Sequence, residues 1–207
     1  MKRFDLITEA DARVLEVGTS VELARGGHIT PLAQETLRDR RITVVRGDGL
    51  DAQADAPSAI RRVTIGSDHS GVALKRALVP ELRARGLAVD DVGTDNEDPV
   101  DYPDIAARVA RSVSRGEADG GIVIDGAGLG SAIAANKVPG VRAAMCTTPT
   151  LARYAREHNG ANVLALGATL VTKDEALAII DVWLTTAMTE PRYLRRLAKI
   201  RRLEEEH

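Results

Sequence analysis

The chain has 207 residues, of which 44% are hydrophobic, so it can bury one sizeable core and still carry a small appendage. Its formal net charge of −2 argues against nucleic acid or an anionic membrane as the main partner. The only cysteine, Cys146, excludes an internal disulfide framework and a cysteine-based zinc site. Because the sequence has neither a secretory signal nor an apolar run of membrane-spanning length, we expect a cytoplasmic protein.

Residues 1–46 predict a small, separate α/β module. Its helices begin at threonines, whose side chains cap free N–H groups, and the second has proline at its first position. The expected elements are a helix from Thr8 through Val14, a strand over 20–23, a helix from Thr30 to about Arg40 and a strand over 42–45. Residues 47–60 begin with a run rich in Gly, Asp, Ala and Pro and predict a linker. This leaves residues 61–207 as the second domain.

The second domain alternates between strand-like and helix-like segments. The expected strands cover 63–67, 87–92, 122–124, 142–146 and 163–166, and the expected helices cover 72–85, 103–114, 131–136, 149–158 and 173–188. Repeated β-α units require right-handed crossovers and a parallel sheet. The sequence therefore predicts an α/β fold with helices on both faces of a five-stranded parallel sheet. An Arg-rich helix over 191–206 has no strand of its own, and we expect it to reach a second subunit.

A glycine-rich turn, DGAGLG, follows the strand over 122–124. Gly126, Gly128 and Gly130 allow positive φ angles and a close approach of a ligand to the main chain. The N–H groups that open the next helix suit an oxyanion or a phosphate. Asp125 stands at the carboxyl end of the strand, where open α/β sheets bind ligands. From these residues alone, a dinucleotide-binding fingerprint and a plain tight turn remain alternatives.

Further polar groups lie at the ends of other elements. Asp68 and His69 follow the first strand, at an active-site position for this fold class, although Asp68 could simply cap the next helix. His158 ends a helix, where carbonyl groups stabilise a protonated imidazole; the alternative is an ordinary C-terminal cap with Asn159 in the left-handed conformation. The last helix carries a phosphate clamp or a solvated basic face, formed by Arg192, Arg195 and Arg196.

Five blocks of the second domain together resemble the type B ribose-5-phosphate isomerases and their galactose-6-phosphate isomerase relatives. The blocks are GSDHSG, VDYPD, IAANKVPGVRAA, AREHNGANVLALGA and PRYLRR, and the match spans about residues 62–202 in unbroken order. The resemblance implies a Rossmann-like three-layer α/β/α sandwich that acts as a homodimer or tetramer with its sites at the subunit interface. It also implies cofactor-free, metal-free aldose–ketose isomerisation of a phosphorylated sugar through an enediolate.

The resemblance assigns roles residue by residue. Asp125 takes the position of the base, His158 that of the histidine that opens the sugar ring, and Asp68 that of the substrate-binding aspartate. The implied substrate-binding residues are His69, Tyr102, Gly126, Ala127, Gly128, Gly130, Asn159, Arg192 and Arg196. Among these, the turn from Gly126 to Gly130 is similar to the anion hole for the enediolate.

Four positions depart from the family pattern. The family's usual Cys-Gly-Thr-Gly, whose cysteine moves the C2 proton, is replaced here by a sequence that begins with Asp125 and has Ala127 in place of the threonine. A second version of the family has a glutamate base where this chain has Ser131, and a phosphate-binding arginine is replaced by Thr169. Two hypotheses follow. The chain is an isomerase with a carboxylate base, or it is a catalytically altered sugar-phosphate-binding homologue that serves as one subunit of a hetero-oligomer.

The N-terminal module has a resemblance of its own. The segments ITEADARVL and GTSVELARGGHITPLAQETLRDRRITV are similar to the leading segment of ethanolamine-utilisation cobalamin adenosyltransferases and other bacterial microcompartment-associated proteins. This implies a docking or encapsulation module with shell or cargo proteins as partners, and a location inside a microcompartment. A dimer-stabilising extension is the alternative.

Overall fold

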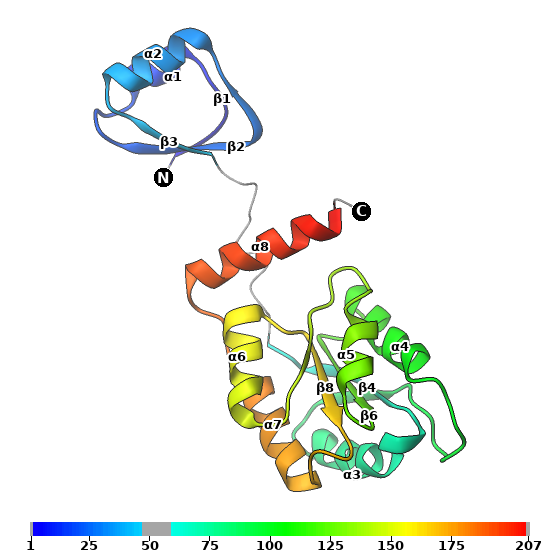
Figure 1. Ribbon diagram of the computed structural model, residues 1–207. Coiled ribbons are helices and arrows are strands. Elements are labelled where there is room, and N and C mark those ends of the chain that lie inside the picture. The colour runs from blue at the N-terminus through cyan, green and yellow to red at the C-terminus, as the bar shows by residue number, and fades with distance from the viewer. Residues whose placement is uncertain (1, 47–58, 206–207) are drawn as a thin grey trace. The chain divides into compact units, whose positions relative to one another are not determined.

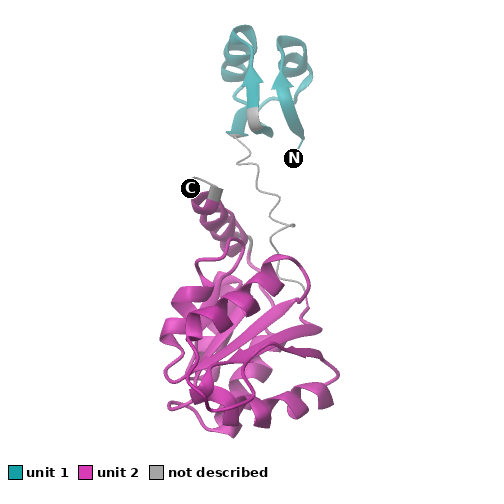
Figure 2. Ribbon diagram, turned by 90° about the vertical axis from the view of Figure 1, so that its right-hand side faces the viewer, with its two compact units in different colours: residues 1–51 teal, residues 52–207 magenta. Residues whose placement is uncertain are grey.

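The computed structural model describes residues 2–46 and 59–205. The chain divides into two compact units, residues 1–51 and 52–207, which are coloured separately in Figure 2. The expected linker over 47–60 lies almost entirely outside the described residues. Its last residue, Ile60, is buried in the core of the second unit. Within the described part of the chain, no helix is long and apolar enough to cross a membrane.

The first unit is a three-stranded parallel sheet with two helices. Its elements are β1 (Arg3–Ile7), α1 (Glu9–Val14), β2 (Ser20–Ile29), α2 (Pro31–Asp39) and β3 (Thr43–Arg46), with sheet order β1-β2-β3. The caps act as expected, since the Thr8 and Thr30 side chains accept main-chain N–H groups at the starts of α1 and α2. Strand β1 was not expected, because it buries only its last residue, Ile7, and its pattern does not alternate. Strand β2 also continues past Leu23, the expected end of that strand.

The second unit holds the remaining elements (Figure 1). They are β4 (Arg62–Ser67), η1 (His69–Gly71), α3 (Val72–Ala84), β5 (Ala88–Asp91), α4 (Tyr102–Ser114), β6 (Gly120–Asp125), α5 (Leu129–Ala135), β7 (Ala143–Met145), α6 (Pro149–Asn159), β8 (Val163–Gly167), α7 (Lys173–Thr185) and α8 (Pro191–Glu205). The expected order of strands and helices is confirmed, including the continuation of α3 through Pro80.

The sheet of the second unit has five parallel strands in the order β5-β4-β6-β8-β7. Side chains of β6 alternate between two cores: Ile122 and Ile124 pack with α3, α6 and α7, whereas Val123 packs with α4 and α5. The predicted three-layer α/β/α sandwich is therefore confirmed. From β4, the chain first adds β5 on one side of that strand and then adds β6 on its other side. The direction in which strands are added therefore reverses, and the topological switch point lies between β4 and β6. Ligands bind in open α/β sheets at the carboxyl ends of strands beside such a point.

Several element boundaries differ from expectation, and two of the differences have a clear packing reason. Strand β6 begins at Gly120 instead of Ile122, because its glycines let neighbours pack onto the strand. A Cβ at Gly120 would lie 2.6 Å from the Trp183 ring, and one at Gly121 would lie 2.6 Å from Val109. Helix α7 ends at Thr185, and Met188 instead joins a small cluster with two side chains of α8, Tyr193 and Leu197.

Candidate active site

Two aspartates meet at the carboxyl edge of the sheet. Ser67 of β4 is paired with Ile124 of β6, so the residues that follow, Asp68 and Asp125, are neighbours. The Asp68 amide donates to the Ile124 carbonyl at 3.1 Å, which ties the two strand ends together. Both aspartates are largely buried, with 6% and 5% of their surface exposed. A buried carboxylate needs hydrogen-bond donors, and both find them in the main chain.

The Asp125 carboxylate lies in the glycine-rich turn. Its Oδ1 accepts the Ala127 N–H at 2.8 Å and also the Gly128 N–H, and its Oδ2 accepts the Ser131 N–H at 2.9 Å. Gly128 has φ +77°, and a Cβ there would lie 2.9 Å from the main chain of Leu166, so glycine is required. The turn does collect main-chain donors as predicted. In this structure, however, those donors bind the protein's own carboxylate.

Asp68 caps the short helix η1, the simpler of the two roles considered for it. Its Oδ1 accepts the N–H groups of Ser70 at 3.0 Å and Gly71 at 3.2 Å, and the Ser70 hydroxyl at 2.6 Å. Next to it, His69 Nδ1 accepts the Val100 N–H at 3.3 Å. Because Nδ1 is an acceptor, the ring proton of a neutral His69 is on Nε2, which makes Nε2 a donor for a ligand oxygen.

Two more side chains are attached to the turn. The Tyr102 ring lies on Gly130, where a Cβ would approach it to 2.6 Å, so the predicted sugar-lining tyrosine does stand beside the turn. Thr169 stands where the resemblance implies a phosphate-binding arginine, and its Oγ1 donates to the Gly126 carbonyl at 2.7 Å. The Thr169 N–H reaches the same carbonyl at 3.0 Å. Thr169 therefore holds the turn and does not supply a positive charge.

The second group of predicted residues gathers around His158 on α6 and α8. The His158 ring stacks on Tyr154 with centroids 4.9 Å apart and lies 4.6 Å from the ring of Tyr193 on α8. The guanidinium groups of Arg192 and Arg196 lie 4.8 and 5.7 Å from the Tyr193 ring centre. Histidine and tail arginines therefore lie close together, as a phosphate clamp beside a ring-opening histidine would need.

Asn159 is the last residue of α6, and the left-handed residue after it is Gly160, with φ 56°. The cap with a left-handed Asn159 is therefore wrong, because glycine takes that conformation without steric cost. The Asn159 side chain instead donates to the Tyr154 carbonyl at 3.3 Å.

The two groups lie at opposite edges of the sheet. Helix α6 starts after the carboxyl end of β7 and returns to the amino end of β8. At 1.5 Å per residue, His158 near its end is roughly 15 Å from the edge that carries Asp125. Figure 1 shows the same separation, with α8 across the end of the sheet opposite to the arrowhead of β8. The Asp125 group and the His158 group therefore do not form one cluster within a single chain.

This fold and these residues match known proteins. A family model described as Ribose/Galactose Isomerase covers residues 63–200. The chain belongs to the ribose/galactose isomerase family. Ribose-5-phosphate isomerase B of Escherichia coli is 41% identical to it over 146 residues, which are 70% of this chain and 98% of that protein.

Solved structures show the same relationship to the ribose/galactose isomerase family. Ribose-5-phosphate isomerase B of Clostridium thermocellum is 50% identical, with a TM-score of 0.69 over 70% of this chain and 98% of that one. The enzyme of Mycoplasma genitalium, solved with bound ribulose 5-phosphate, is 39% identical, with a TM-score of 0.68 over 70% of this chain and 97% of that one. The family model leaves residues 1–62 unmatched.

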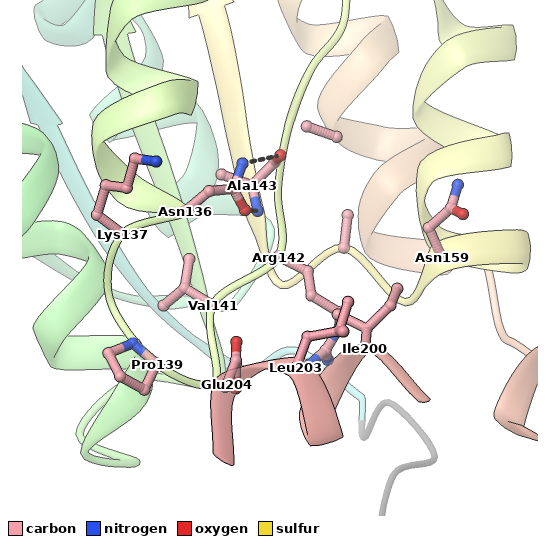
Figure 3. Close-up of a pocket in the computed structure, with 12 residues that line it drawn as sticks. Asn136, Lys137, Pro139, Val141, Arg142, Ala143, Asn159, Ile200, Leu203 and Glu204 are labelled. Carbon is pink, nitrogen blue, oxygen red and sulfur yellow. Dashed lines mark hydrogen bonds between the residues drawn. The ribbon is translucent and has the colours of Figure 1, made fainter. Parts of the chain in front are cut away.

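In this family member, a cavity of about 800 Å³ lies at the same edge as His158 (Figure 3). It is bounded by the segment over 136–144, the end of α6 and α8, and Asn159 is among its lining residues. Asn136 pins the segment by accepting the Ala143 N–H at 2.8 Å and donating to the Ala143 carbonyl at 2.9 Å. Glu204 of α8 accepts the Gly140 N–H at 2.9 Å, which joins the helix to that segment.

Sequence reasoning missed several contributors to this site. Val100 orients His69, Thr169 holds the turn, and Tyr154 and Tyr193 sandwich His158. Tyr154 precedes His158 by four residues on one helix, and that spacing by itself predicts neighbouring rings. The other contacts join elements far apart in the chain, and no local sequence pattern predicts them.

Proposed function

We propose that this chain interconverts the aldose and ketose forms of a phosphorylated sugar of the ribose 5-phosphate/ribulose 5-phosphate type. The observation that carries the proposal is the position of Asp68, Asp125 and the glycine-rich turn at the switch point of a ribose/galactose isomerase fold. The relatives named ribose-5-phosphate isomerase B support this substrate class.

The proposed reaction needs no cofactor. His158 moves a proton between the ring oxygen and O1 to open the sugar. Asp125 then takes the proton from C2, and the electrons of that C–H bond form the C1–C2 double bond of the enediolate while O1 takes the negative charge. A proton passes from O2 to O1, and Asp125 returns its proton to C1 as the C2 carbonyl forms. Asp68 and Tyr102 hold the sugar hydroxyls. The phosphate is bound by His69 together with Arg192 and Arg196, and Asn159 binds the substrate beside His158. The turn over 126–130 stabilises the oxyanion.

We further propose that two copies of the chain build each site. The support is the separation within one chain between the Asp125 group and the His158 group, at opposite sheet edges. A symmetric dimer, alone or within a tetramer, can bring the first group of one copy to the second group of the other.

Mixing two inactive variants tests this arrangement. Asp125→Asn and His158→Asn should each lose activity, by roughly two to four orders of magnitude if proton transfer is lost. After co-refolding, half of the dimers are hybrids with one intact site, so about a quarter of wild-type activity should return. No recovery, together with a stable monomer in light scattering, would refute the shared site.

A second candidate function rests on the hydrogen bonds of Asp125. Because its carboxylate already binds the turn, the chain can be a sugar-phosphate-binding homologue that supplies one type of half-site to a hetero-oligomer. An isomerisation screen over ribose, allose, galactose and tetrose phosphates separates the two functions. Turnover that Asp125→Asn abolishes supports the isomerase. Binding without turnover, equal in wild type and Asp125→Asn, supports the binding subunit.

For residues 1–46 we propose a docking module for a bacterial microcompartment. Its support is the resemblance of ITEADARVL and the segment that follows to the leading segments of microcompartment-associated proteins. A fusion of residues 1–58 to a fluorescent protein should collect in shells of a shell-forming host. Diffuse fluorescence, equal to that of the unfused fluorescent protein, would contradict the docking role.

A further inference from the structure

The turn over 126–130 has a resident anion in this protein. Three main-chain N–H groups, those of Ala127, Gly128 and Ser131, point at one carboxylate, and all three come from within six residues of Asp125. The carboxylate is buried, with 5% of Asp125 exposed, which limits the competition of water for these donors. Hydrogen bonds from main-chain N–H to an ionised acceptor are among the strongest in proteins.

Each of these N–H groups carries a single hydrogen. A donor that is used by Asp125 is therefore not available to an oxygen of a substrate. The same turn is the part of the fold that would stabilise the enediolate under the proposed function. The Asp125 carboxylate and the substrate oxyanion thus compete for N–H donors of the same turn. Their negative charges also repel when both are present in a buried site.

We propose that Asp125 is an internal competitor for the oxyanion-binding turn, so that turnover requires its carboxylate to leave the turn. This rests on the proposed function for its substrate, but the occupied turn itself is a property of the free protein. When the Asp125 side chain rotates out of the turn, the three N–H donors become free. The same rotation releases the carboxylate oxygens to act on the C2 proton.

The turn does not depend on the carboxylate for its shape. Gly128 holds its left-handed conformation, and Thr169 fixes the Gly126 carbonyl through both its hydroxyl and its N–H. The Ala168 N–H donates to the main-chain carbonyl of Asp125 at 2.8 Å, so the backbone of that residue is held as well. The donors therefore stay in place when the side chain rotates away, and they can receive another oxyanion.

The first experiment uses the free protein and acetate, the smallest probe of a carboxylate site. In wild type, the amides of Ala127, Gly128 and Ser131 should exchange slowly with solvent and show no chemical-shift response to acetate. In Asp125→Ala they should exchange faster, and acetate should shift them back toward the wild-type positions. Asp174→Ala, which removes an exposed carboxylate from α7, is the matched control and should behave as wild type.

Two outcomes would overturn the proposal. Wild-type turn amides that respond to acetate as those of Asp125→Ala do would show that the turn is open. Fast exchange of the three amides in wild type would show that they have no lasting acceptor. Both observations are made on the wild-type chain, so they decide the matter even if Asp125→Ala does not fold. Asp125→Asn, which keeps the side-chain volume, then serves as the second variant.

The second experiment uses 4-phosphoerythronate, whose carboxylate takes the place of the enediolate oxygens. Asp125→Ala should bind it about tenfold more tightly than wild type, the equivalent of one recovered charge-assisted hydrogen bond. Equal or weaker binding by the variant contradicts competition at the turn. If neither protein binds 4-phosphoerythronate but the acetate experiment gives the expected result, the proposed substrate class is wrong. The conclusion that Asp125 occupies the turn would still hold.

Discussion

The two edges of the five-stranded sheet handle charge in different ways. At the carboxyl edge, Asp68 and Asp125 are buried and bound by main-chain N–H groups that the strand ends and turns hold in place. At the amino edge, His158 is about one-third exposed and rests between the rings of Tyr154 and Tyr193. One edge is fixed by backbone, and the other is assembled from side chains of two helices.

This difference indicates which part of the proposed reaction the residues at each edge carry out. Backbone donors cost little to organise at the moment of reaction, which suits the stabilisation of an oxyanion. Stacked aromatic and guanidinium groups adapt to a ligand by small movements, which suits the capture of a phosphate and the handling of a flexible sugar. Substitutions at the carboxyl edge should therefore destabilise the protein strongly, whereas substitutions at the amino edge should affect only the structure near the substituted residue.

The largest effect is expected at the carboxyl edge from Gly128→Ala. The new Cβ would lie 2.9 Å from the main chain of Leu166 while φ stays at +77°, so steric overlap adds to conformational strain. We expect a loss of about 3 kcal/mol in the free energy of unfolding, measured by denaturant titration. Gly86→Ala is the matched control, because Gly86 has φ +80° and no atom within 4 Å of the added Cβ. It should cost only about 1 kcal/mol; equal costs would mean that the turn has room to relax.

A smaller, local effect is expected at the amino edge from Tyr193→Ala. Tyr193 is buried in a small cluster with Met188 and Leu197, so its loss should cost about 2 kcal/mol and release α8 while the sheet stays folded. Hydrogen exchange should show faster exchange in α8 and unchanged protection in β6. Tyr154→Ala removes the other ring stacked on His158 from an exposed position and should cost less than about 1 kcal/mol. Loss of protection throughout the sheet would show that the amino edge is as rigid as the carboxyl edge.

The smallest effect concerns the pH dependence of an ion pair at the amino end of β4. The Arg62 guanidinium, aided by the N–H groups of Arg61 and Arg62, lowers the pKa of Asp119 below its usual value. A carboxylate with a lowered pKa adds stability above the unfolded-state pKa of about 4, and this is lost as the pH falls through the folded-state pKa. Asp119→Asn should therefore cost about 1 kcal/mol at pH 7 after solvent screening, and progressively less as the pH falls through the folded-state pKa.

Thermal unfolding of wild type and Asp119→Asn from pH 2 to pH 7 measures this difference. Arg62→Gln should reproduce most of the effect, since it removes the first cause of the lowered pKa. If the difference in unfolding temperature between wild type and Asp119→Asn stays constant with pH, the substitution acts through packing and not through the lost charge.

The expected fold agrees with the structure where local patterns repeat and fails where they do not. The β-α alternation from Arg62 onward, with its apolar strands and capped helices, made the parallel sheet predictable. Strand β1 was missed because it buries a single residue and depends on pairing with β2 for its existence. Even the start of β6 was missed, since Gly120 and Gly121 belong to the strand only because Trp183 and Val109 pack against them.

The sequence by itself determined which residues meet at the carboxyl edge, because a parallel sheet places every residue that follows a strand end at that edge. It also determined the family, through five blocks in unbroken order. The tertiary structure alone decided the state of those residues. Whether the N–H groups of the turn are open or bound by Asp125 depends on the rotamer of the Asp125 side chain. Whether His158 lies near Asp125 depends on the length and direction of α6. Local sequence periodicity does not predict the distances between elements or the hydrogen-bond acceptor that an N–H group chooses. Both arise from packing between segments far apart in the chain.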